Sequence, residues 1–258
     1  MLDSSVQVAR VLAASPLQLD IEAILAHPTV HGLSTRYILM EYQRTVWADY
    51  VHVHNLVRRT ADVSQVLFHL LDGQRALRPR AAVRCTRIVS QTLAVAGHDR
   101  ARMLRFLEAQ IDFDLRYRFW RHVTPLPDPI GCDLVTAGVQ HQPDGTYTVA
   151  STCRKDVATC HLPDFLAGHR PELYAIADHL AAHPDAIKDQ PRVERLLVAV
   201  LADPRAALGQ AACWPLGDVI IALQVPPDAA LWTLDPDFEP LAAVLGLRLY
   251  QPPQIANP

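Results

Sequence analysis

Strand and helix patterns alternate at both ends of this chain, whereas the middle reads almost entirely as helix. Near the start we expect a short strand, a helix over 17–26, a strand over 30–33, and a long helix capped by Ser34 or Thr35. Near the end the same rhythm returns, with helices over 216–224 and 237–245 and strands over 230–233 and 247–250. Alternation of this kind favours a parallel sheet with helices on both faces.

The middle of the chain predicts a separate, mostly helical unit. Residues 61–123 keep a helical pattern, and proline-rich residues 125–129 follow. Two strands are expected over 132–139 and 147–151, around the turn sequence Gln-Pro-Asp-Gly, and helices over 171–183 and 192–201. The predicted fold class is therefore α/β: a three-layer parallel-sheet core from residues 1–60 and 205–258, with a mostly helical insertion over 61–204.

Composition narrows the class of protein without naming an activity. Half of the 258 residues are hydrophobic and 20% are charged, as in ordinary globular proteins. The net charge of −3 gives no overall basic field, although a local patch can still attract nucleic acid. The apolar runs are too short to cross a membrane, and the N-terminus lacks a signal-peptide pattern. We expect a cytoplasmic protein with no membrane partner, whose cysteines are thiols or metal ligands.

Four acidic residues fall at element boundaries where chemistry is often placed. In Trp-Pro-Leu-Gly-Asp-Val-Ile-Ile-Ala-Leu, residues 214–223, Asp218 begins a helix. In Ala-Leu-Trp-Thr-Leu-Asp-Pro-Asp-Phe, residues 230–238, Asp235 follows a strand. Asp3 ends the first strand, and Glu41 lies on the helix after the second. Together these features resemble the PIN-domain nucleases, over roughly 1–57 and 210–250.

The resemblance implies a metal-dependent hydrolase of phosphodiesters, most often an endoribonuclease acting on single-stranded RNA. Crowded carboxylates repel one another, and a hard cation such as Mg²⁺ or Mn²⁺ relieves that repulsion. By analogy, Asp3 and Asp235 would bind the metal directly and Asp218 directly or through water, with Glu41 positioning water or acting as an outer ligand. Members of the family include toxins and RNA-processing enzymes, so the implied partners are RNA and an antitoxin-like protein inhibitor.

Two departures from the family pattern leave alternatives open. Only Met1 and Leu2 precede Asp3, so either the first strand is short or the true start lies upstream. A long insertion also separates Glu41 from Asp218. Each acid taken singly is also compatible with an ordinary helix cap or turn. The alternatives are a catalytically inactive PIN-like protein that binds RNA or acts as a scaffold, and a zinc-stabilised regulatory module.

The cysteines suggest a second metal. Cys132, Cys153, Cys160 and Cys213 could close a tetrahedral Zn²⁺ site that ties the insertion to the core. Their spacing is not the usual pair of short knuckles, so unrelated buried thiols are the alternative interpretation.

Arginines and aromatic residues alternate over 116–121, a pattern that suits stacking against single-stranded RNA. The alternative is a solvated helix face above core aromatics. The arginines predicted to bind substrate are Arg116, Arg118 and Arg121, and earlier arginines that could contact phosphate include Arg75 and Arg78.

Overall fold

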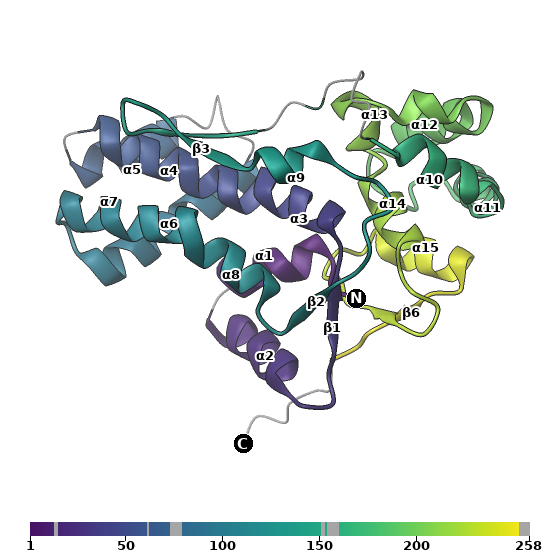
Figure 1. Cartoon of the computed structure of the whole chain (residues 1–258), viewed down its shortest axis with the longest axis horizontal. Coiled ribbons are helices and arrows are strands. Elements are labelled where there is room, and N and C mark those ends of the chain that lie inside the picture. Colours follow the sequence, from purple (N-terminus) through teal and green to yellow (C-terminus); the bar gives the residue numbers. More distant parts are fainter. Residues whose placement is uncertain (13–14, 61, 73–78, 151–152, 154–159, 253–258) are drawn as a thin grey trace.

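The computed structural model describes residues 1–12, 15–60, 62–72, 79–150, 153 and 160–252. Helices dominate it, and each strand is only two or three residues long. Figure 1 shows helices α4 to α8 on one side of the short strands β1 and β2, and helices α10 to α13 on the other. Arg75 and Arg78 lie outside the described residues.

The N-terminal part is built around one long helical rod. Thr35 begins it, since its hydroxyl accepts a hydrogen bond from the Ile38 N–H at 3.3 Å, which confirms the predicted cap. A π-helical turn interrupts the rod and divides it into three labelled elements. The elements are α1 (Ser4–Leu12), α2 (Ser15–Ala26), β1 (Gly32–Ser34), α3 (Arg36–Tyr42), η1 (Gln43–Trp47) and α4 (Ala48–Arg59).

The middle part is helical, as expected, up to residue 120. Its elements are α5 (Val63–Asp72), α6 (Pro79–Ala96), α7 (Arg100–Ala109), η3 (Gln110–Asp114), α8 (Leu115–Trp120), β2 (Val123–Pro125), α9 (Asp133–Ala137), β3 (Val139–His141), β4 (Tyr147–Val149), α10 (Leu162–Gly168), α11 (Arg170–Ala182) and α12 (Gln190–Ala202).

The strand predicted over 132–139 is wrong for most of its length. Residues 133–137 form the helix α9, and only the last position of the predicted strand belongs to β3. Gly138, at a positive φ of 53°, ends the helix and redirects the chain into β3, which pairs antiparallel with β4. The run was too short for periodicity to distinguish a strand from a helix.

The C-terminal part follows the predicted order of helix, strand, helix and strand. Its elements are η4 (Pro204–Ala207), α13 (Gln210–Cys213), α14 (Gly217–Leu223), β5 (Ala230–Leu231), α15 (Phe238–Leu245) and β6 (Arg248–Leu249).

Short parallel pairings bring the two ends of the chain together. β1 pairs with β2, and β5 pairs with β6, both in parallel. Leu2 lies between the two pairs: its N–H donates to the Leu33 carbonyl at 2.8 Å, and it forms a parallel bridge with Trp232. In Figure 1 the N-terminus accordingly lies beside β1 and β6. These pairings fix the position of the residue that follows Leu2.

The predicted three-layer α/β core is nevertheless wrong. The chain is mostly helical, and its sheets are two-stranded pairs rather than a large parallel sheet covered on both faces. Strands this short bury little apolar surface, so helices supply most of the core. Its largest buried cluster draws on α3, α4, α7, α11 and α14, with members such as Leu39, Val53, Leu107, Ile176 and Ile220.

This buried cluster includes side chains from both of the predicted parts, residues 1–60 with 205–258 and residues 61–204. The division into two parts stays a prediction. Among the described residues, no helix combines the length and apolar character needed to cross a membrane.

Candidate active site

Asp3 is held rigidly at the point where the two ends of the chain meet. Its N–H donates to the Trp232 carbonyl at 2.9 Å, and the residue is only 1% exposed. Its carboxylate accepts hydrogen bonds from the backbone N–H groups of Ser4 and Ser5 at the start of α1. The hydroxyls of Ser5 and Thr233 donate to it at 2.6 and 2.9 Å. Four donors therefore orient this carboxylate.

Glu41 lies near the end of α3 and is 7% exposed. Burial raises its pKa to about 7, with the Arg44 charge opposing the rise, the Asp3 charge adding to it, and a hydrogen bond from the Ser4 side chain lowering it. A Cβ atom on Gly217 would lie 2.5 Å from Glu41 Oε1, so any other residue at this position would displace the carboxylate. The Gly-Asp motif of α14 and the glutamate of α3 therefore pack directly against each other.

Asp218, in the first turn of α14, lies within electrostatic range of the other predicted acids. Burial raises its pKa to about 8, and the charges of Glu41, Asp3, Asp235 and Asp237 raise it further in that order. The structure thus brings together all four acids that the sequence singled out. It also adds Asp237, which the sequence analysis treated only as part of a turn.

Asp235 lies in the segment between β5 and α15 and is paired with a lysine from a distant part of the chain. Lys188 Nζ lies 2.9 Å from Asp235 Oδ1 and 3.3 Å from Asp237 Oδ2. These contacts raise the lysine pKa, the hydrogen bond to Asp235 most of all. The sequence analysis missed Lys188. Its rarity was the available signal, since only it and Lys155 are lysines among 24 basic residues.

Arg44 is the second cation beside the acids, and the sequence analysis missed it as well. It lies on the π-helical turn η1, with Nη2 4.0 Å from Glu41 Oε1. Its guanidinium carbon lies 4.0 Å from the centre of the Trp214 ring, a stacked cation–π arrangement. Its Nη1 is buried and has no hydrogen-bond partner among the residues that the structure describes. A buried guanidinium nitrogen without a partner is unfavourable, so this atom is available to bind an anionic group.

The donor set has the chemistry of a hard-cation site. The donors from Asp3, Glu41, Asp218 and Asp235 are carboxylate oxygens, which Mg²⁺ and Mn²⁺ prefer. The pKa values of Glu41 and Asp218 are raised first by burial and then by neighbouring carboxylates, whose charge a divalent cation would neutralise. As the side chains stand, no three His, Cys, Asp or Glu in the described ranges form a group that could hold a metal. Binding would therefore require small side-chain rotations, including release of Asp235 from Lys188.

The three arginines predicted to bind substrate do not share one surface. Arg116 and Arg121 line a shallow surface hollow beside α8, together with Asp112, Phe113, Tyr117 and Trp120. Arg118 instead influences the interior: burial raises the pKa of Tyr50 to about 12, and the Arg118 charge opposes that rise. Residues two apart on a helix point to different sides, which explains the split.

The four cysteines predicted to bind zinc also approach one another. Burial is the largest cause of the raised pKa values of the Cys132 and Cys213 thiols. The charges of other cysteines in the set raise both pKa values further. The four cysteines lie beside the α13–α14 segment.

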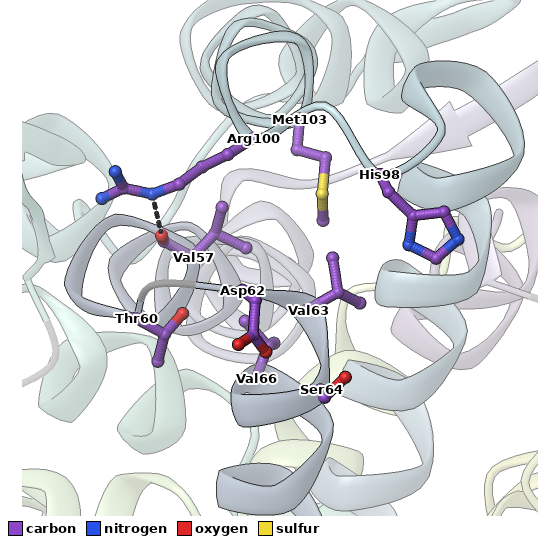
Figure 2. A pocket seen from close by; sticks show the side chains of 9 residues that line it. All are labelled: Val57, Thr60, Asp62, Val63, Ser64, Val66, His98, Arg100 and Met103. Carbon is purple, nitrogen blue, oxygen red and sulfur yellow. Dashed lines mark hydrogen bonds between the residues drawn. The ribbon is translucent and has the colours of Figure 1, made fainter.

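One pocket lies elsewhere in the molecule. It is found where the end of α4, the start of α5 and the junction of α6 with α7 meet, and Arg100 Nε donates to the Val57 carbonyl at 3.0 Å there (Figure 2). None of the four acids lines it. Figure 1 shows α5 and α7 at the end of the molecule away from α14. We assign it no role in the chemistry at the acids.

The chain matches no protein-family model, no curated protein and no solved structure.

Proposed function

We propose that this chain is a Mg²⁺- or Mn²⁺-dependent nuclease that cleaves phosphodiester bonds in single-stranded RNA. The observation that carries the proposal is the gathering of Asp3, Glu41, Asp218 and Asp235, from distant parts of the sequence, into one mutually repelling group. The resemblance of segments 214–223 and 230–238 to PIN-domain nucleases supports the same chemistry.

Within this proposal the aspartates hold the ion. Asp3, already oriented by four donors, and Asp218, facing the other acids, are the inner ligands. Asp235 completes the set once its oxygen leaves Lys188. A bound divalent ion supplies Lewis-acid stabilisation of the negative charge on the phosphate.

Glu41 is the proposed proton acceptor for the attacking water. A pKa of about 7 places it near the operating pH, where a general base is both sufficiently ionised and sufficiently basic. The glycine at position 217 keeps its carboxylate unobstructed. Gln at position 41 would retain the shape and lose the proton acceptor.

Arg44 is the proposed ligand of the scissile phosphate. Its stack on Trp214 fixes the plane of the guanidinium, and its unpartnered Nη1 can donate to a phosphate oxygen. A lysine at this position would retain the charge but lose both the stack and the planar fork of donors.

The preference for single strands is based on the exposed face of η3 and α8. Phe113 and Tyr117 are 65% and 54% exposed, and their rings stack in parallel with centroids 5.8 Å apart. Exposed aromatic rings beside Arg116 offer stacking surfaces for unpaired bases.

The test is cleavage of end-labelled single-stranded RNA and DNA of matched sequence in Mn²⁺, comparing the parent chain with Asp218→Asn. We expect the substitution to reduce the rate by about 100-fold or more, as loss of a group that supports a metal commonly does. Asp228→Asn is the matched control, since Asp228 is an exposed aspartate outside the acidic group, and it should cleave at the parental rate. Equal rates for Asp218→Asn and the parent, or no Mn²⁺-dependent cleavage at all, would instead favour an inactive RNA-binding or scaffold protein.

A further inference from the structure

Four cysteines from separate segments lie side by side next to α13. Cys132 immediately precedes α9, Cys160 lies just before α10, and Cys213 is the last residue of α13. The segments of the first two are joined by a hydrogen bond of 2.7 Å from the His161 N–H to the Ile130 carbonyl. This contact places two of the four sulfur-bearing segments beside each other.

Cys153 joins this group through the start of α13. The Gly209 N–H donates to its sulfur, and the Gly209 carbonyl accepts from the Cys213 N–H at 2.9 Å. The charge of Cys153 acts on Cys132, and the charges of all three other cysteines act on Cys213. The four cysteines therefore form one group, although up to 81 positions separate them in the sequence (from 132 to 213).

Three of the four sulfurs accept hydrogen bonds from backbone N–H groups. The backbone N–H groups two and three residues after Cys132, and the N–H two residues after Cys160, donate to their respective sulfurs. The Tyr37 hydroxyl lies 3.5 Å from the Cys213 sulfur. Donors aimed at sulfur stabilise the thiolate and orient it, as outer-shell donors do around bound metals.

We propose that Cys132, Cys153, Cys160 and Cys213 together bind one structural Zn²⁺ ion. Four thiolates are the ligand set of closed tetrahedral zinc sites, and soft sulfur excludes the Mg²⁺ or Mn²⁺ proposed for the acids. The sulfurs are not in disulfides, and the described side chains are not yet closed around a metal position. Binding draws the sulfurs inward and releases their protons, in keeping with thiols that repel one another when ionised.

The zinc ion would stabilise the segment that carries Asp218 of the proposed active site. Cys213 precedes Asp218 by five residues on the α13–α14 segment. Tyr37, on the same helix as Glu41, donates its hydroxyl to the Cys213 carbonyl at 3.2 Å. Zinc at the cysteines would therefore fix the segment that presents Asp218 to Glu41.

The first test is the metal content of the full chain purified without chelators, measured by plasma mass spectrometry. We expect about one zinc ion per chain. Cys132→Ser and Cys213→Ser should lose it, whereas Cys85→Ser should retain it, because Cys85 is buried between α4 and α6 beside Asp49. Retention of full zinc by both cluster variants would overturn the proposal.

A second measurement does not depend on whether the variants fold. After zinc is removed from the reduced parent chain, Co²⁺ is added and the absorption spectrum recorded. Four thiolates predict intense sulfur-to-cobalt bands in the near ultraviolet together with the visible bands of tetrahedral Co²⁺. Octahedral Co²⁺ without sulfur bands, or a disulfide between any two of the four cysteines in the parent chain as purified, would contradict the zinc site.

Discussion

The acidic group and the cysteine group are built alike but neutralised differently. Both gather side chains from distant segments, and both lie against α13 and α14. The acids have cations of the protein's own beside them, Lys188 on Asp235 and Arg44 on Glu41. The largest effects on the thiols instead come from burial, hydrogen-bond donors and other acidic groups. In our proposals the acids therefore bind an exchangeable ion, whereas the thiols bind a permanent one.

The largest effect is expected at the cysteines. Removing zinc from the parent chain with a strong chelator should lower Tm by about 10 °C or more, because structural zinc contributes directly to folding free energy. Cys213→Ser should already be destabilised, and chelator should change its Tm little further. Thermal unfolding followed by circular dichroism measures both. If the chelator left the Tm of the parent chain unchanged, the cysteines would hold no structural zinc, and this difference from the acidic group would be lost.

At the acids, removal of one carboxylate should raise the stability of the metal-free chain, whereas removal of a cysteine should lower stability. The pKa of Asp218 is raised from 3.8 to about 8, so between these pH values the folded chain binds more protons than the unfolded chain. Stability therefore falls as pH rises through this window. Asp218→Asn removes that penalty, so the metal-free variant should melt about 2–4 °C above the metal-free parent at pH 8. The gain should vanish near pH 4, where the parent carboxyl is also neutral.

If Asp218→Asn instead lowered the Tm at pH 8, the carboxyl would be making favourable contacts that outweigh its repulsion. Substitution would then lower the stability of the chain in both groups, by different amounts.

The packing of Glu41 against Gly217 predicts an intermediate effect. Gly217→Ala places a Cβ 2.5 Å from Glu41 Oε1, so the carboxylate must move. Because the end of the Glu41 side chain can move, we expect little loss of stability but about a 10-fold slower cleavage rate. Gly168→Ala is the control, because a Cβ there meets nothing within 4 Å. Equal effects of the two substitutions would show that the contact does not position Glu41.

The smallest effect is expected at Lys188. Lys188→Met keeps an apolar stem and frees Asp235, so the Mn²⁺ concentration that gives half-maximal cleavage should fall about 2–5-fold, the worth of an exposed ion pair. Lys188→Arg keeps the cation and should behave as the parent does. Competition between lysine and metal would be contradicted if the Mn²⁺ concentration for half-maximal cleavage fell only in Lys188→Arg. It would also be contradicted if that concentration rose in Lys188→Met.

Local signals predicted most helices and the members of both groups. The cap at Thr35, the helix from Gly217 and the strand residues at 230–231 all follow from patterns within a few residues. The large sheet was predicted wrongly, because the alternating rhythm does not reveal that each strand stops after two or three residues. The helix at 133–137 was missed for a related reason, since a short apolar run fits either structure.

The partners of the acids could not be read from the sequence. Lys188 reaches Asp235 across 47 positions, and Trp214 supports Arg44 across 170. Each pairing depends on how α12, α14 and η1 pack, and no local pattern encodes such packing. The arginines over 116–121 show the converse, because a regular local pattern was divided between an exposed hollow and a half-buried position near Tyr50 once the helix formed.

The central claim is that the four carboxylates bind a divalent cation. Isothermal titration of Mn²⁺ into the zinc-loaded parent chain at pH 7.5, alongside Asp218→Asn and the control Asp228→Asn, tests it most directly. We expect Mn²⁺ to bind the parent and the control, with release of protons from Glu41 and Asp218, and we expect no binding to Asp218→Asn. Identical titrations for Asp218→Asn and the parent, or no binding to any of the three, would contradict it.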